Sequence, residues 1–134
     1  MRSFLEITNK SRKVPISKKA QIADTFMSRL AGLMLSPPCD MVLEFPAQSV
    51  NRCSIHTCFM RFPINLIWVN KDMVVVDIAY APPLNPLNPE TFKIYKPKEP
   101  ALYVIELCAE DKNPGDIKDI VKIWDRVEFK RYGS

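Results

Sequence analysis

Short runs of alternating polarity or of β-branched residues are the feature that most constrains how this chain can fold. They are FLEIT, KVPIS, AQIA, MVLEF, SIHTCFM, INLIWVN, MVVVDIAYA, ALYVIEL and RVEFK. Side chains of a strand point alternately to its two faces, so such runs predict strands with one or both faces buried. The polar centre of VNKDM, Asn70 to Asp72, is typical of a hairpin turn and predicts antiparallel neighbours there.

We therefore expect an α+β fold that is mostly β: a small barrel-like or strongly curved antiparallel sheet with one short helix packed on it. The helix is predicted within DTFMSRLAGLM, where Asp24 or Thr25 can cap the start and apolar residues recur at helical spacing. We expect it to run from Thr25 to Leu33 across one opening of the sheet, with its apolar stripe buried. A second short helix or turn is expected around AEDKNPGDIKD.

A proline-rich segment precedes the last strands. Six of the twelve prolines fall between Pro82 and Pro100. Proline lacks an N–H donor and has a fixed φ, so this segment cannot be a central strand. Within it, TFKIY is predicted to form a short edge strand. The segment is either a rigid strap over the sheet or a recognition loop, and the sequence leaves both interpretations open.

The length of the chain predicts a single domain over residues 1–134, large enough to bury a core without disulfides. Hydrophobic residues make up 47% and charged residues 25%, which is ordinary globular usage and disfavours disordered and membrane classes. Glu6 and Lys10 interrupt any signal peptide, and no run approaches the roughly 18 apolar residues of a membrane span, so we expect a cytoplasmic protein. Its four cysteines are then expected to be reduced thiols.

Charge and glycine content argue against several function classes. The net charge of +4 is spread over the two ends of the chain rather than gathered in one basic run, so nucleic-acid binding is not expected. With three glycines, no Gly-rich phosphate loop of the P-loop or Rossmann type is available. The sequence also has no acidic cluster that suggests a magnesium or calcium site. We expect no cofactor.

The single histidine of the chain lies between two cysteines in CSIHTCFMRF. On a regular strand Cys53 and His56 point to opposite faces, and no CxxC pair is present, so no metal site is predicted. Cys58 shares a face with His56, which would allow a nucleophile and its base. The Cα atoms of such a pair are about 6.6–7 Å apart, however, which makes a direct hydrogen bond awkward. The other interpretation of Cys58 is a small buried hydrophobe.

His56 is either a structural histidine or part of a site. Its neighbours Met60 and Phe62 indicate an apolar face, where a histidine ring usually donates to a carbonyl or a carboxylate. The candidate acids, both flanked by apolar residues, are Glu106 in YVIELC and Asp77 in VVVDIAY. Such carboxylates are either paired or shifted in pKa, and either condition can mark a functional site.

Four motifs follow one another in order: ADTFMSRLAGLM, SIHTCFMRFPINLIWVN, VVVDIAYAPP, and YVIEL followed by PGDI. In order and spacing they resemble the bacterial and archaeal family called domain of unknown function 192. The resemblance covers most of the chain, from Ala23 to Ile123. It implies a compact, largely β fold and no established activity, so the function has to be argued from the residues.

Individual positions carry the resemblance and one departs from it. The family's R-x-x-G-L-M pattern is matched by Arg29, Gly32, Leu33 and Met34. In the central strand of the family, Met60 and Pro63 match, whereas Asn65 stands at the position of an acid. If that acid does proton or metal chemistry in the family, this chain lacks it. If the acid only caps a turn, asparagine can replace it.

The function that we expect is binding. A pocket or groove would receive a small polar or anionic ligand, because arginine offers a forked set of donors and histidine an adjustable one. Its expected residues are Arg29, His56, Asn65 and Glu106. Arg29 is equally well explained by a buried structural ion pair.

Two other functions stay open. One is an enzyme with His56 as general acid or base, oriented by Glu106 or Asp77. The other is a protein or nucleic-acid interaction module that uses the proline-rich segment and the basic ends. No membrane partner is expected, and the sequence indicates neither the identity of the ligand nor an oligomeric state.

Overall fold

The computed structural model describes residues 4–23, 40–56, 63–82, 85–89, 93–108 and 114–132. In this part of the chain the elements are β1 (Phe4–Asn9), β2 (Val14–Ala23), β3 (Asp40–Ser49), β4 (Ile55–His56), β5 (Ile64–Val69), β6 (Val75–Ala81), β7 (Ile94–Tyr95), β8 (Ala101–Cys108), the 3-10 helix η2 (Pro114–Asp119) and β9 (Val127–Tyr132). The predicted helix from Thr25 to Leu33 lies outside the described residues. The prediction of a mostly β fold is confirmed.

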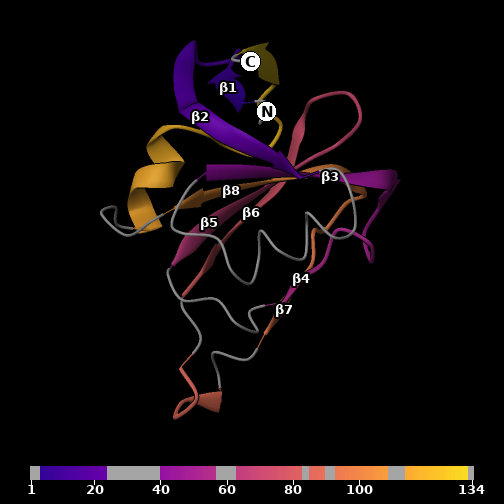
Figure 1. Ribbon diagram of the computed structural model, residues 1–134, viewed down its shortest axis with the longest axis vertical. Coiled ribbons are helices and arrows are strands. Elements are labelled where there is room, and N and C mark those ends of the chain that lie inside the picture. Colours follow the sequence, from indigo (N-terminus) through magenta and orange to yellow (C-terminus); the bar gives the residue numbers. More distant parts are fainter. Residues whose placement is uncertain are drawn as a thin grey trace.

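Seven strands form one sheet in the order β6-β5-β8-β3-β2-β1-β9, and β4 and β7 form a separate two-stranded sheet (Figure 1). The expectation of an antiparallel sheet is corrected at one pair, because β2 and β3 are parallel, with Ala20 opposite Asp40 and Ala23 opposite Leu43. Parallel neighbours need a connection of a dozen or more residues, and β2 and β3 are separated by enough sequence for one. Alternating polarity marks which residues form strands but not the relative direction of neighbours, so the sheet is mixed.

The main sheet is not closed into a barrel, so the prediction of a barrel-like sheet is only loosely supported. Its edge strands β6 and β9 approach each other at their first residues. There Val74 and Arg126 form an isolated antiparallel bridge, and the backbone N–H of Val127 donates to the carbonyl oxygen of Met73 at 2.9 Å. Within the described residues the bridge does not extend into a ladder, although the N–H of Val75 donates to the carbonyl oxygen of Asp125 at 2.8 Å and the carbonyl oxygen of Val75 accepts from the N–H of Trp124 at 2.7 Å.

Local predictions for the turns and the short elements are confirmed. The side-chain Oδ1 of Asn70 accepts the backbone N–H groups of Asp72 at 2.9 Å and of Val74 at 3.0 Å, which holds the hairpin between antiparallel β5 and β6. Among its described residues, the proline-rich segment contributes β7 to a sheet, where Tyr95 lies opposite Ile55. The predicted helix or turn in AEDKNPGDIKD is η2. Among the described residues, no helix has the length and apolar character that crossing a bilayer requires.

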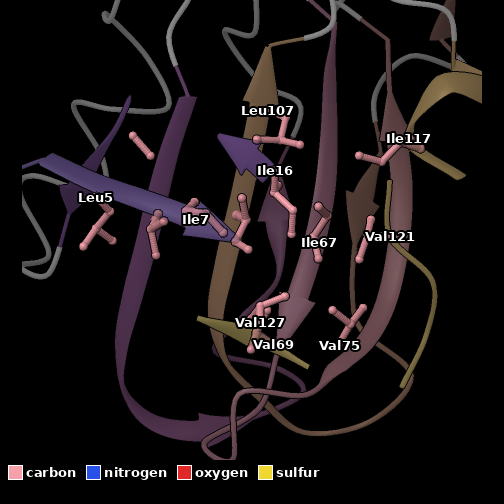
Figure 2. Close-up of a cluster of buried hydrophobic side chains, with 13 residues drawn as sticks. Leu5, Ile7, Ile16, Ile67, Val69, Val75, Leu107, Ile117, Val121 and Val127 are labelled. Atoms are coloured by element: carbon pink, nitrogen blue, oxygen red, sulfur yellow. The ribbon is translucent and has the colours of Figure 1, made fainter. Parts of the chain in front are cut away.

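Buried side chains cover both faces of the sheet. The first cluster consists of Leu5, Ile7, Ile16, Ala20, Val42, Ile67, Val69, Val75, Ile105, Leu107, Ile117, Val121 and Val127 (Figure 2). The second cluster consists of Met41, Leu43, Cys53, Ile55, Ile64, Leu66, Trp68, Val76, Ala81, Ala101 and Val104. All six residues of β5 are buried because the strand lies between the two clusters and sends alternate side chains into each.

Candidate functional site

The sheet register separates the two predicted site residues whose side chains the structure describes. Asn65 on β5 lies opposite Leu107 on β8 and Tyr80 on β6, whereas Glu106 on β8 lies opposite Leu66. Directly opposed residues project from the same face of a sheet. Asn65 therefore faces the first cluster and Glu106 faces the second. The structure does not bring these two side chains together.

The other residues singled out in the sequence are described to different extents. Arg29 lies outside the described residues, and His56 is described by its backbone alone, opposite Ile94. Cys53 is buried in the second cluster and its thiol donates to the carbonyl oxygen of Ala101 at 3.0 Å. Asp77 accepts the backbone N–H of Lys98 through Oδ2 at 3.0 Å, so it anchors the proline-rich segment.

A cavity of about 710 Å³ lies on the Asn65 side of the sheet. Its sheet wall consists of Asn65 and residues 78–80, and its other wall consists of Ile117, Lys118 and residues 121–123. Small-molecule sites in proteins have volumes of roughly 300–1,000 Å³. This Asn65 cavity is therefore large enough for a metabolite with an aromatic ring.

In the wall opposite the sheet, buried apolar residues and exposed lysines each recur four residues apart. Ile117 and Val121 are buried in the first cluster, where Figure 2 shows them beside Ile67. Lys118 and Lys122 directly follow these two residues in the chain and remain exposed. Burial of the two apolar side chains thus leaves two exposed lysines among the residues that line the Asn65 cavity.

Asn65 is the buried polar group of this cavity. Its side chain is 2% exposed, and its Oδ1 has no hydrogen-bond partner in the part of the chain that the structure describes. A buried acceptor without a partner costs about 1–3 kcal/mol. Rotation of the amide about its last bond exchanges Oδ1 with Nδ2, so a hydroxyl, which both donates and accepts, can satisfy either orientation.

The charge at the cavity is positive. Lys118 and Lys122 belong to the lining, and the described lining residues include no carboxylate to neutralise them. The potential there favours an anionic group, while the apolar side chains of Ile78, Ile117 and Val121 favour a hydrocarbon body. The described lining thus combines two cationic side chains, one buried amide and an apolar surface.

A network around Asp125 holds the lysine-bearing wall against the first hairpin. Asp125 Oδ2 accepts from Asn9 Nδ2 at 2.8 Å, from Arg12 Nε at 2.7 Å and from the backbone N–H of Lys122 at 2.9 Å. Asn9 Nδ2 also donates to the carbonyl oxygen of Ile120 at 2.9 Å. Burial raises the pKa of Asp125, but the hydrogen bonds from Asn9, Lys122 and Arg12 and the charge of Arg12 more than offset it, so the pKa is lowered.

Trp124 stands at the edge of the cavity wall. It follows Ile123, which lines the cavity, and its side chain is 68% exposed. Its φ of 77° lies in the left-handed region, which costs a residue with a Cβ about 1–2 kcal/mol. The backbone N–H of Trp124 donates to the carbonyl oxygen of Val75 at 2.7 Å and helps to hold this conformation. The exposed indole therefore belongs to a residue next in the chain to the cavity lining.

Glu106 is a buried ionisable group of the opposite face, where Asp77, opposite Trp68, is also buried. Its side chain is 6% exposed beside the second cluster, and Oε2 has no hydrogen-bond partner among the described residues. Burial raises the pKa of Glu106 to about 7. Glu106 is not among the described residues that line the Asn65 cavity.

Asn65 was a candidate from the sequence, whereas Lys118 and Lys122, which line the same cavity, were not. The segment IKDIVKI repeats an apolar residue followed by a lysine at a spacing of four, which is a sign of one buried and one exposed edge. That sign indicates amphipathic structure but not which part of the sheet the buried edge covers. The Asp125 network gave no sequence signal, because Asn9 and Arg12 lie at the opposite end of the chain.

Comparison with known proteins agrees with the architecture. Residues 6–119 match the DUF192 family model, described as Uncharacterized ACR, COG1430. A UPF0127 protein of Pyrococcus abyssi is 31% identical over 92% of this chain and 96% of its own length. A UPF0127 protein of Thermococcus gammatolerans is 40% identical over 82% of this chain and 69% of its own.

A solved structure extends the agreement to the fold. A crystal structure of a protein of unknown function from Novosphingobium aromaticivorans superimposes with a TM-score of 0.67 at 20% identity, over 93% of this chain and 83% of that one. At this level of identity the likeness concerns the fold alone.

Proposed function

The chain belongs to the DUF192 family, and we propose that it is a binding module whose Asn65 cavity receives a small polar or anionic ligand. One observation carries the proposal: the amide of Asn65 is buried in the cavity and its Oδ1 lacks a hydrogen-bond partner among the described residues. A fold retains such a group at a cost in stability, and a ligand that bonds to the amide removes that cost.

The chemistry of the lining supports binding over catalysis. The described polar residues of the cavity are Asn65, Tyr80, Lys118 and Lys122. Without a histidine, a cysteine or a carboxylate among them, this group lacks the usual pairing of a nucleophile with a base. The alternative of an enzyme that uses His56 stays a prediction and concerns a different part of the chain.

Calorimetric titration with phenylpropionate at low ionic strength tests the proposal. We expect the double variant Lys118→Gln/Lys122→Gln to bind about five- to tenfold more weakly than the unaltered protein, because two exposed ion pairs are removed. The control Lys130→Gln/Arg131→Gln removes the same charge from exposed positions of β9 and should change the affinity by less than about twofold. Equal affinities for the two double variants would contradict a site at the Asn65 cavity.

A further inference from the structure

We infer that the ligand of the Asn65 cavity is an organic acid with three parts in series: an anionic group at the surface, an apolar body, and a hydroxyl at the inner end. The inference rests on the proposed function and adds to it the chemistry and the orientation of the ligand. It follows from the order in which polar and apolar groups line the cavity between solvent and sheet.

The inner end is defined by Asn65. Its side chain is 2% exposed, whereas Lys118 and Lys122 on the other wall are exposed. A group that reaches the amide has therefore left bulk water, and a charged group there would lose its hydration at a far higher cost than a neutral one. A neutral hydroxyl loses less hydration and can both donate to and accept from the amide.

The middle of the cavity is apolar. Ile78 on the sheet wall faces the segment that carries Ile117 and Val121, and all three contact the first cluster. A polar chain placed between them would bury groups without partners, so a hydrocarbon body is favoured. The volume of about 710 Å³ accommodates a benzene ring.

The outer end is set by the two lysines. An ammonium group is a compact point charge on a flexible stem, so Lys118 and Lys122 can both approach one anion without requiring a fixed planar geometry. Their exposure means that the anionic group of the ligand stays partly hydrated, which avoids the cost of burying it. The acid end therefore points outward.

Three matched probes test this order of groups: para-hydroxyphenylpropionate, phenylpropionate, which lacks the hydroxyl, and para-hydroxyphenylpropanol, which lacks the acid. We expect the first to bind about tenfold more tightly than the second and about five- to tenfold more tightly than the third. Dissociation constants are measured by calorimetry, with the fluorescence of exposed Trp124 as an independent signal.

Variants test which residue is responsible for the tighter binding due to the hydroxyl and which for the tighter binding due to the acid. The hydroxyl advantage is the ratio of the dissociation constant of phenylpropionate to that of para-hydroxyphenylpropionate. In Asn65→Leu this ratio should fall from about ten to about one, while phenylpropionate still binds. In Lys118→Gln/Lys122→Gln the hydroxyl advantage should persist while the advantage of the acid over the alcohol disappears. Asn65→Ala serves as a second variant, and thermal unfolding establishes that each variant is folded before titration.

The outcomes separate the inference from the proposed function. If both acids bind the unaltered protein equally well and depend on the lysines, the inference is wrong and the proposed function stands. If the hydroxyl advantage survives in folded Asn65→Leu and Asn65→Ala, the assignment of the inner end is wrong. If neither acid binds, or if binding ignores the lysines, both the inference and the proposed function fail.

Discussion

The two faces of the main sheet each bury one polar side chain whose oxygen has no partner among the described residues, and they differ in what surrounds it. Asn65 borders a cavity with two lysines, whereas Glu106 lies beside the packed second cluster. A neutral amide beside a cavity can gain a partner from a ligand. A carboxyl in a packed core has no such route and responds by holding its proton. The same lack of a partner thus supports the proposed binding on one face and predicts a pH-dependent stability on the other.

The largest expected difference between the faces is in packing. Leu66→Ala, in the second cluster, should lower the free energy of unfolding by about 2–5 kcal/mol, because it leaves a void in a close-packed core. Ile78→Ala should cost only about 1–2 kcal/mol, since this half-buried side chain already borders a cavity. Chemical denaturation of both variants measures the difference, and equal losses would show that the two faces are packed alike.

The next effect concerns Glu106 and pH. Its pKa is about 7 in the folded protein against 4.5 as the reference value, so folding is favoured when the carboxyl is protonated. This stabilisation is fully present below pH 4.5 and is lost as the pH rises towards 7, a change on the order of 3 kcal/mol. Glu106→Gln should remove this slope. We would compare the free energies of unfolding of the two proteins across the same pH range, and parallel curves would contradict the buried carboxyl.

The Asp125 network predicts the opposite dependence on pH. Its lowered pKa means that its contribution is present above the reference value of 3.8 and is lost as the pH falls through the folded-state pKa. Asp125→Ala should cost about 2 kcal/mol at neutral pH, because it removes three hydrogen bonds at a largely buried carboxylate. Glu128→Gln, which breaks the exposed pair with Lys10, is the control and should cost less than about 0.5 kcal/mol. Similar losses in the two variants would argue against a special role for Asp125.

The smallest effect is a gain. Asn65→Leu should raise the free energy of unfolding by about 1 kcal/mol, because an apolar side chain of similar size has no polar atom left without a partner. Ligand binding should suffer in the same variant, so stability and affinity change in opposite directions. Thermal unfolding without ligand measures the gain. A loss of stability would show that the amide already has a partner in the folded protein.

The sequence predicted the strands well and their arrangement partly. Alternation identified β1 and β8, and the polar turn at Asn70 identified the β5–β6 hairpin, because these signals are local. The parallel pairing of β2 with β3 and the single bridge at Val74 depend on how distant segments meet. No local pattern specifies such long-range pairing.

The candidate site was predicted to a lesser degree. Asn65 stood out at the position of an acid in the family and Glu106 as a carboxylate flanked by apolar residues, and both prove to be buried. Their separation onto opposite faces follows from the register of β5 against β8, which the sequence alone does not give. Lys118 and Lys122 join Asn65 only because η2 and the turn after it pack on the first cluster.

Amide NMR during titration with para-hydroxyphenylpropionate tests the central claim most directly, since it monitors both faces in one experiment. We predict that the side-chain amide of Asn65 and the backbone amides of Lys118 and Lys122 shift together with a single dissociation constant, while Leu66 and Glu106 barely move. Shifts centred on Leu66 and Glu106, or a silent Asn65 amide in a protein that binds the probe, would contradict the assignment of the binding site to the Asn65 face.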